Sequence, residues 1–298
     1  MYLYTLGTHP DLEKQVMLKT GLKPGSFQDK VFKNGEYFVK VDQDVSGKKV
    51  AILSVIIDPC EEIFRLLFLL NALKSNKASR VSLVLPYYPY SRQDRVSHPG
   101  EPISAELIAA ITAAAGADRI ISVDIHNPRG LGKYKRKLQN IKPYEIMASA
   151  LEKTIDSSWV LVAPDKGAEK RVRELARVLK IKKTAYLKKE RPRPGEAKIT
   201  DISGDQVNAE KTLIVDDMID SGGTLIEAAN FIRQRGAKMI SAVCTHGIFS
   251  NDALKRINRS VIKNVYCSDT LPIIKKDSGK LIIIPINSLV AKAIKKNV

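Results

Sequence analysis

Short apolar runs separated by longer amphipathic stretches constrain the fold of this chain more than any other feature. Each run is long enough for one strand, and the stretches between runs show the spacing of helices. The expected strands are residues 49–57, 80–86, 119–125, 159–163, 212–215, 239–244 and 264–267. The expected helices are residues 61–74, 103–116, 169–179 and 224–235. Because these strands are apolar throughout, both faces of their sheet must be covered, which predicts an α/β fold with mostly parallel strands.

The pattern occurs twice along the chain. Three pairs of segments are similar and follow the same order: 48–59 with 210–221, 80–86 with 238–244, and 118–128 with 263–272. They suggest duplication of one α/β unit, although generic similarity between any two such domains explains the same matches. A chain of 298 residues suffices for two domains of about 150 residues each. The predicted domains are 1–143 and 144–284, with the tail 285–298 joining the first.

Composition leaves two kinds of partner open. The net charge is +17, which suits either a nucleic-acid binder or an enzyme with anionic substrates. The lysines are scattered and form no long basic tail, so charge alone favours neither. The apolar stretch 63–73 is interrupted by Arg65 and Asn71 and is too short to span a bilayer, so no membrane association is expected. Three cysteines without a C-x-x-C pair predict reduced thiols in a cytoplasmic protein.

The segment 213–224 (LIVDDMIDSGGT) is the strongest candidate for a binding site. An apolar run leads directly into Asp216 and Asp217, at the strand end where open α/β sheets bind ligands. Glycines then let backbone amides approach an anion, and the following helix N-terminus adds partial positive charge. A phosphate monoester is expected at Asp220, Ser221, Gly222, Gly223 and Thr224, and the paired carboxylates suit the vicinal hydroxyls of a sugar.

This segment resembles the phosphoribosyl-diphosphate loop of type I phosphoribosyltransferases. Further segments narrow the resemblance to the ribose-phosphate diphosphokinase family, also called phosphoribosyl-diphosphate synthetases. They are 32–36 (FKNGE), 90–95 (YSRQDR), 124–128 (DIHNP), 163–171 (APDKGAEKR) and 189–191 (KER). The resemblance extends from residue 5 to about residue 290 in the family's order. It implies two duplicated type I phosphoribosyltransferase-like domains, each a mostly parallel sheet flanked by helices.

The resemblance also implies roles for individual residues. In the first copy, Asp58-Pro59-Cys60 stands where Asp220-Ser221-Gly222 stands in the second, so the first phosphate loop is degenerate. The implied ATP-binding residues are Arg92 and Gln93, with Phe32, Asn34, Gly35 and Glu36 reaching the adenine of a neighbouring subunit. The implied ribose 5-phosphate residues are Asp216, Asp217, Asp220, Ser221, Gly222, Gly223 and Thr224. The implied Mg²⁺-linked residues are His126 and Asp165, and the implied catalytic residues are Lys189 and Arg191.

Some positions depart from the family pattern. Asn34 replaces an Asp, and Ala168 replaces the second of two glycines after Asp165. The stretch after His126 lacks a Phe-Phe-Asp segment that builds subunit contacts in many members, which leaves the size of the assembly open. We expect at least a dimer with a shared adenine site, binding ATP and ribose 5-phosphate, without nucleic acid or membrane partners.

Two segments are expected to be irregular. Residues 188–196 are charged and carry Pro192 and Pro194, which exclude a regular helix or a central strand and predict a mobile surface loop. Residues 131–142 are strongly basic and are also expected to form a surface loop.

The predicted reaction is Mg²⁺-dependent transfer of the β,γ-diphosphoryl group of ATP to the anomeric hydroxyl of ribose 5-phosphate. Two alternatives stay open. A nucleobase phosphoribosyltransferase would keep residues 216–224 but would need neither residues 90–95 nor Lys189 and Arg191. A non-catalytic regulatory homologue, or a nucleic-acid-binding regulator that senses the metabolite, would not need all four of Lys189, Arg191, His126 and Asp165.

Overall fold

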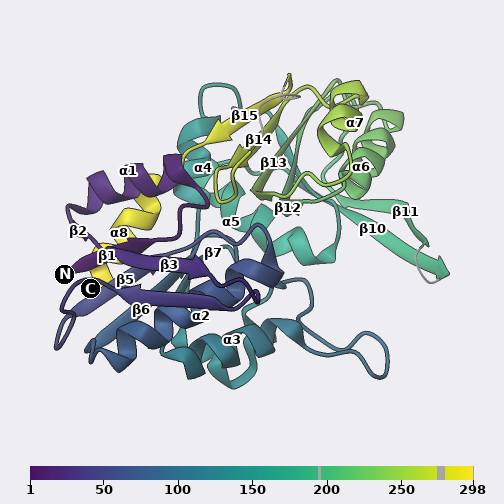
Figure 1. Cartoon of the computed structure of the whole chain (residues 1–298). Helices are drawn as coiled ribbons and strands as arrows, with labels where there is room; N and C mark the ends of the chain where they lie inside the picture. Colours follow the sequence, from purple (N-terminus) through teal and green to yellow (C-terminus); the bar gives the residue numbers. More distant parts are fainter. Residues whose placement is uncertain (194–195, 274–278, 298) are drawn as a thin grey trace. The chain divides into compact units, whose positions relative to one another are not determined.

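The computed structural model describes residues 1–193, 196–273 and 279–297, and only the backbone of 191–193 and 196–198. The chain divides into two compact units (Figure 1). Unit 1 comprises Met1–Lys142, Thr270–Pro272 and Ile286–Val298, and unit 2 comprises Pro143–Asp269 and Ile273–Pro285. Among the described residues, none of the helices is both long and apolar enough to cross a membrane.

Unit 1 is built on a parallel sheet with the strand order β2-β1-β5-β6-β7-β8. Its strands are β1 (Tyr2–Thr5), β2 (Lys23–Pro24), β5 (Lys49–Leu53), β6 (Arg80–Leu85), β7 (Arg119–Val123) and β8 (Leu138–Ile141). A separate antiparallel hairpin joins β3 (Phe27–Val31) to β4 (Tyr37–Val41). The helices are α1 (Pro10–Thr20), α2 (Pro59–Ser75), α3 (Ser104–Ala115), the 3₁₀ segment η1 (Pro128–Lys137) and α8 (Asn287–Asn297).

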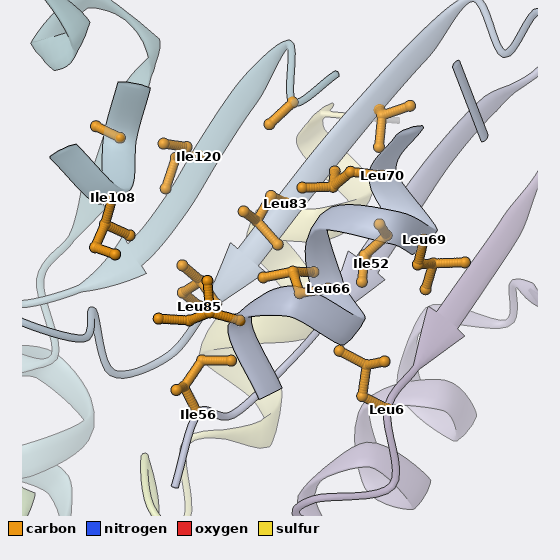
Figure 2. Close-up of a cluster of buried hydrophobic side chains, with 14 of the residues drawn as sticks. Leu6, Ile52, Ile56, Leu66, Leu69, Leu70, Leu83, Leu85, Ile108 and Ile120 are labelled. Carbon is orange, nitrogen blue, oxygen red and sulfur yellow. The ribbon is translucent and has the colours of Figure 1, made fainter. Parts of the chain in front are cut away.

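The core of unit 1 lies between this sheet and its helices. Helix α2 buries one apolar face, formed by Ile63, Leu66, Leu69, Leu70 and Leu73 at helical spacing. Figure 2 shows Leu66, Leu69 and Leu70 of this face near side chains from β5, β6 and β7. Full burial of one such side chain contributes about 1.5–3 kcal/mol. The uniformly apolar strands therefore sit where the pattern predicted, inside a covered sheet.

Unit 2 is built on a sheet with the strand order β11-β10-β9-β12-β13-β14-β15, parallel except for the pair β10–β11. The strands are β9 (Val160–Ala163), β10 (Thr184–Arg193), β11 (Glu196–Gly204), β12 (Lys211–Ile219), β13 (Met239–Gly247), β14 (Val265–Ser268) and β15 (Leu281–Ile284). The helical segments are α4 (Tyr144–Leu151), η2 (Lys166–Ala168), α5 (Glu169–Leu179), α6 (Gly223–Gln234) and α7 (Ala253–Arg259). Two separate cores, one with α6 and the other with α4 and α5, cover the sheet. The predicted α/β class with mostly parallel strands is confirmed.

The prediction of an irregular loop at residues 188–196 is wrong, because most of this segment forms the two arms of the hairpin β10–β11. In the hairpin, Lys189 pairs with Ile199, and the register shifts between Lys188 and Lys189 because Thr200 is an extra residue on β11. Pro192 falls where the register shifts between Glu190 and Arg193, so its missing N–H interrupts no regular ladder. Pro194 lies outside the described residues. In Figure 1 the hairpin extends away from the other strands of its sheet.

The loop prediction for residues 131–142 is also wrong. This segment continues η1 and then forms β8, which pairs with β7 at the edge of the sheet. Leu131 is fully buried, and Tyr134 and Leu138 pack against the core of unit 1. These apolar positions anchor the segment, while its basic side chains remain at least partly exposed.

Candidate active site

The turn between β12 and α6 presents backbone amides at a helix N-terminus. Gly222 precedes α6 with φ of 77°, in the left-handed region that favours glycine. Among the described residues, no side chain caps this helix. Gly223 and Thr224 are exposed, so the first amides of α6 face solvent with the positive end of the helix dipole. The arrangement is suited to an anion such as a phosphate group.

Two side chains hold this turn in shape. The Ser250 hydroxyl donates a hydrogen bond of 2.5 Å to Asp220 Oδ1. The Arg256 guanidinium donates to the carbonyl oxygen of Ser221. Both come from the segment after β13, so neither was identified from the sequence of the turn itself. We call residues 220–224 with their open amides the phosphate cradle.

The corresponding turn of unit 1, between β5 and α2, is closed by its own carboxylates. Asp58 is the N-cap of α2 and accepts a hydrogen bond from the Cys60 amide at 3.1 Å. Glu62 Oε2 accepts from the amides of Ile57 and Asp58, at 2.5 and 3.0 Å. These acids satisfy amides that an anion would otherwise contact, and their negative charge opposes its approach. The two turns therefore differ: side-chain carboxylates occupy amides of the unit 1 turn, whereas no side chain caps α6 in unit 2 among the described residues.

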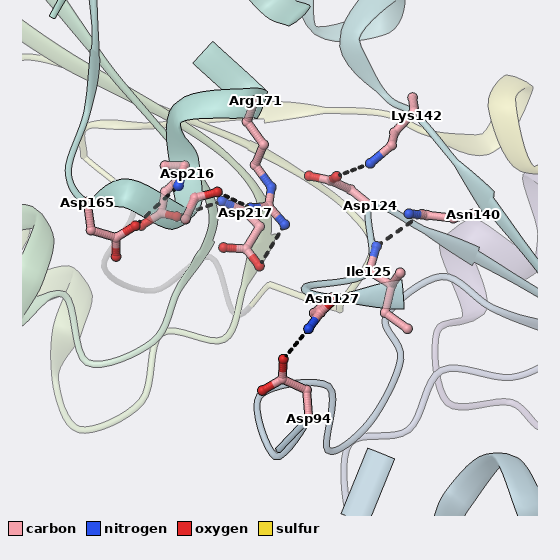
Figure 3. Close-up of polar contacts among 12 residues, drawn as sticks. Asp94, Asp124, Ile125, Asn127, Asn140, Lys142, Asp165, Arg171, Asp216 and Asp217 are labelled. Atoms are coloured by element: carbon pink, nitrogen blue, oxygen red, sulfur yellow. Dashed lines mark hydrogen bonds and ion pairs between the residues drawn. The ribbon is translucent and has the colours of Figure 1, made fainter. Parts of the chain in front are cut away.

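A buried ion pair connects the carboxylates of β12 to the loop after β9. Arg171 Nη2 lies 3.2 Å from Asp217 Oδ2, and both residues are under 9% exposed (Figure 3). Arg171 Nη1 donates to the carbonyl oxygen of Gly167 at 3.3 Å. In the same loop, Asp165 Oδ1 accepts from the Ala168 amide at 3.2 Å. Arg171 therefore fixes the loop of Asp165 relative to the acidic end of β12.

Asp216 lies beside two other acids. Its Oδ1 accepts a hydrogen bond from the Asp217 amide at 2.8 Å. Burial, together with the negative charges of Asp217 and Asp165, raises the pKa of Asp216 well above its ordinary value. A carboxyl group held in this way favours a cation or a hydroxyl donor next to it. The acids therefore concentrate negative charge at this end of β12, and Asp217 is partly neutralised by Arg171.

In unit 1, hydrogen bonds bring the segments 90–95 and 124–128 together. Asn127 Nδ2 donates to Asp94 Oδ2 at 2.6 Å (Figure 3). Between them these segments carry Arg92, Gln93 and His126, and the side chains of all three are exposed. Gln93 Oε1 accepts from the Ser104 hydroxyl at 2.6 Å, which fixes its amide at the start of α3.

Asp124, at the end of β7, anchors the second segment. It is fully buried with φ of 40°, and its Oδ1 lies 3.0 Å from Lys142 Nζ (Figure 3). The next amide, that of Ile125, donates to Asn140 Oδ1 at 3.1 Å. A left-handed backbone at a non-glycine residue costs free energy, and here these polar contacts hold it in place. His126 follows two residues after Asp124, so its position depends on this anchor.

The turn between β3 and β4 exposes the residues expected at an adenine site. The Phe32 amide donates to the Glu36 carbonyl at 2.8 Å, and Gly35 has φ of 89°. Asn34 Oδ1 accepts from the Glu36 amide at 3.2 Å, so the residue that replaces the family's Asp serves the turn itself. Phe32 is 43% exposed, and Asn34 and Glu36 are exposed as well.

The predicted catalytic and metal-linked residues are distributed over both units. Lys189 Nζ lies 3.6 Å from Glu227 Oε2 on α6. The side chain of Arg191 lies outside the described part of the structure. His126 belongs to unit 1 and Asp165 to unit 2. Within the described ranges, no group of three or more His, Cys, Asp and Glu side chains is arranged to hold a metal ion by itself.

The chain is similar to known proteins over nearly its whole length. Residues 1–116 match the N-terminal domain of ribose phosphate pyrophosphokinase, and residues 171–298 match the phosphoribosyl synthetase-associated domain. The ribose-phosphate pyrophosphokinase of Fusobacterium nucleatum is 33% identical over 98% of this chain and 93% of its own length. The chain belongs to the ribose-phosphate pyrophosphokinase family. The Aquifex aeolicus member is 36% identical over 89% of this chain and 85% of its own length.

A crystal structure supports the same assignment. That of the phosphoribosylpyrophosphate synthetase from Mycobacterium smegmatis has a TM-score of 0.89 and 30% identity, covering 99% of this chain and 97% of that one. The predicted family, its enzyme class and the α/β fold with mostly parallel strands are confirmed. Sequence analysis missed Glu227, Ser250 and Arg256, which belong to none of the family segments. It also missed the ion pair of Arg171, although this residue ends the segment 163–171.

Proposed function

We propose that this enzyme transfers the β,γ-diphosphoryl group of ATP to ribose 5-phosphate, giving phosphoribosyl diphosphate and AMP. The observation that carries the proposal is the uncapped phosphate cradle of unit 2, which directly follows Asp216 and Asp217. The closed turn of unit 1 supports it, because it leaves one cradle for one sugar phosphate.

Ribose 5-phosphate binds unit 2 in this proposal. The cradle residues Asp220, Ser221, Gly222, Gly223 and Thr224 hold the 5-phosphate. Asp216 and Asp217 accept hydrogen bonds from the ribose hydroxyls, and the ion pair with Arg171 fixes the position of the Asp217 carboxylate for that task. ATP binds residues of unit 1, with Arg92 and Gln93 contacting the nucleotide and Phe32, Asn34, Gly35 and Glu36 of a neighbouring copy contacting its adenine.

The reaction is an in-line displacement at phosphorus. The anomeric oxygen attacks the β-phosphorus of ATP, the bond from that phosphorus to the α,β-bridging oxygen breaks, and AMP leaves with that oxygen. Positioning and charge neutralisation accelerate such transfers. Lys189 and Arg191 neutralise negative charge that develops on the transferred group. Bound Mg²⁺, for which His126 and Asp165 are the proposed protein groups, would neutralise phosphate oxygens.

The test is formation of AMP from ATP by the purified full chain. The proposal requires that AMP appear only when ribose 5-phosphate and Mg²⁺ are both present. A regulatory homologue would form no AMP. A nucleobase phosphoribosyltransferase would instead consume phosphoribosyl diphosphate when given a nucleobase. We propose the cytoplasm as the site of this activity and the domains 1–143 with 285–298 and 144–284 as its two halves.

Replacement of Asp216 by Asn should stabilise the ligand-free protein while it abolishes ribose 5-phosphate binding. Because the pKa of Asp216 is raised in the folded state, its stabilising contribution is present at low pH and is lost as the pH rises and the group ionises. Stabilising substitutions of this kind commonly add about 0.5–2 kcal/mol to the free energy of unfolding, so Tm should rise by about 1–8 °C at pH 7. At pH 4 the two proteins should differ little.

Differential scanning calorimetry without ligands measures this effect. Asp201→Asn is the matched control. Hydrogen bonds from the Ile202 amide and Lys188 lower the pKa of Asp201, so neutralising it should not raise Tm. A lower Tm for Asp216→Asn at pH 7 than for the wild type would contradict the account of this acidic site.

The active form should be at least a dimer, and specific activity should fall on dilution into the nanomolar range. The turn of Phe32 is exposed, and beside it a groove of about 510 Å³ is lined by Phe64 and Phe68 of α2. Large exposed apolar side chains of this kind favour association. If a neighbour supplies half of each adenine site, dissociated subunits bind ATP incompletely.

Analytical ultracentrifugation in parallel with the AMP assay tests this point. We expect the loss of activity to follow the loss of the dimer. A monomer with full activity at nanomolar concentration would contradict the shared adenine site and the role of Phe32.

A further inference from the structure

Glu227 contacts both strands of the hairpin that carries Lys189. Its Oε2 lies 3.6 Å from Lys189 Nζ, and its Oε1 accepts a hydrogen bond of 3.0 Å from the Ile199 amide. Lys189 and Ile199 are paired residues of β10 and β11. The Glu227 carboxylate on α6 therefore contacts one cross-strand residue pair of the hairpin. It contacts the side chain of the β10 residue and the backbone of the β11 residue.

The position of Glu227 connects this contact to the phosphate cradle. Glu227 lies one helical turn after Gly223, at the start of α6. The base of the hairpin packs on the same helix, because Leu187 and Ile199 share a core cluster with Leu225, Ala228 and Ala229. The charged contact thus lies next to a fixed apolar contact, on the helix whose first turn forms the cradle.

The alternation of side chains along β10 explains how Lys189 reaches α6. Successive residues of a strand point to opposite faces, so Lys188 and Lys189 lie on different faces of the hairpin. Lys188 pairs with Asp201 of β11 and is 61% exposed, whereas Lys189 is only 17% exposed. Two neighbouring lysines of one strand therefore have different partners and different exposure.

The ion pair is weak enough to be exchanged. The N–O separation of 3.6 Å exceeds that of a charge-assisted hydrogen bond, and Glu227 is 36% exposed. Pairs of this exposure contribute little, because solvent screens them. A polyphosphate carries more negative charge than one carboxylate and can compete for the lysine.

We propose that Glu227 is a positioning residue that holds Lys189 on α6 in the ligand-free enzyme and releases it to the phosphates of ATP. The inference rests on the proposed catalytic role of Lys189. It makes ATP compete with Glu227 for the lysine, so the apparent affinity for ATP is reduced by the fraction of enzyme in which the pair is closed.

Glu227→Gln tests the competition with little change in shape. Glutamine keeps a carbonyl oxygen for the Ile199 amide but loses the charge that holds Lys189. Calorimetry with Mg²⁺ and an ATP analogue with a methylene group between the α- and β-phosphorus measures binding without turnover. We expect the dissociation constant to fall by a factor of about 1.5 to 5.

The same substitution in a Lys189→Ala background distinguishes two explanations. Glu227 either withholds Lys189 from ATP or repels the phosphates of ATP directly. Without the lysine no pair exists, so Glu227→Gln should then leave analogue binding unchanged. Equal tightening in both backgrounds would mean that the carboxylate merely repels phosphate, which would overturn the proposal. Unchanged or weaker binding by Glu227→Gln alone would overturn it as well.

Two controls complete the design. Glu210→Gln removes a similarly exposed ion pair, with Lys183 at 2.7 Å, and should not change analogue binding. Hydrogen exchange at the Ile199 amide should be unchanged in Glu227→Gln and faster in Glu227→Ala, which shows that the glutamine variant keeps the hairpin attached. If Lys189→Ala keeps wild-type kcat, the catalytic role fails. Failure of the catalytic role is thus measured by kcat of Lys189→Ala, whereas failure of the Glu227 proposal is measured by analogue binding.

Discussion

Lys189→Ala should lower kcat by roughly 10²–10³, with much smaller changes in KM for either substrate. Lys189 is paired with Glu227, so its contact with phosphate oxygens has to replace that ion pair. An interaction that is strongest in the transition state raises kcat far more than it tightens substrate binding. Loss of one well-placed charge that stabilises a transition state costs about 3–4 kcal/mol. Initial rates of AMP formation at varied ATP and ribose 5-phosphate give both constants.

Lys188 is the matched control for this substitution. It precedes Lys189 on β10, carries the same charge and pairs with Asp201 at 3.2 Å. Lys188→Ala should retain kcat within about twofold, because an exposed pair of this kind contributes little. Equal losses in the two variants would mean that only the positive charge of the hairpin matters. Wild-type kcat for Lys189→Ala would remove this lysine from the mechanism.

Gly223→Val should abolish ribose 5-phosphate binding and leave binding of an ATP analogue nearly intact. A Cβ atom at Gly223 meets only Ser221 Oγ, at 3.8 Å, so the protein itself has room for a side chain. That room is the space in front of the first amides of α6, which the phosphate needs. The valine therefore blocks the ligand without disturbing the fold.

A graded series makes this result specific. Gly223→Ala adds one methyl group and should weaken binding less than valine does. Calorimetry with each ligand separately gives the comparison, and an unchanged Tm shows that the cradle mutant is folded. If Gly223→Val binds ribose 5-phosphate like the wild type, the phosphate lies elsewhere and the cradle is not its site.

The periodicity of the sequence predicted the central strands well, because they are buried on both faces. The expected helix 169–179 is α5 with the same bounds, and the expected strand 80–86 is β6, which ends at Leu85. The strand 212–215 was predicted too short, since β12 continues to Ile219 through Asp216 and Asp217. Charged side chains disfavour a buried strand, so Asp216 and Asp217 indicated a strand end, and the sequence does not show that Asp217 is paired with Arg171.

The outer elements were less predictable for a different reason. Sequence analysis did not anticipate β1, α1 or α8, although α1 and α8 lie against each other in unit 1. The hairpin β10–β11 was mistaken for a loop because its prolines and charges disfavour a central strand, whereas its arms pair mainly with each other. The basic segment after His126 was mistaken for a loop because a few buried positions, such as Leu131, were outweighed by many lysines.

Candidate site residues that follow one another in sequence were accessible to motif analysis, and those that act across elements were not. The turn at residues 220–224 and the helix start after it could be predicted, because their geometry depends on consecutive residues. Arg171 and Glu227 have no such signature, since their importance lies in contacts with Asp217 and Lys189 that only folding creates. The closed turn of unit 1 could be predicted in part, from the missing glycines, but its capping by Glu62 could not.

Phosphorus NMR of the complete reaction tests the central claim most directly. The purified chain is incubated with ATP, ribose 5-phosphate and Mg²⁺, and the products are resolved by their phosphorus signals. Diphosphoryl transfer predicts AMP and phosphoribosyl diphosphate in equal amounts, with no ADP formed. Appearance of ADP with a ribose bisphosphate would show transfer of a single phosphoryl group, and ATP cleavage without ribose 5-phosphate would show hydrolysis. Either result would contradict the proposed function.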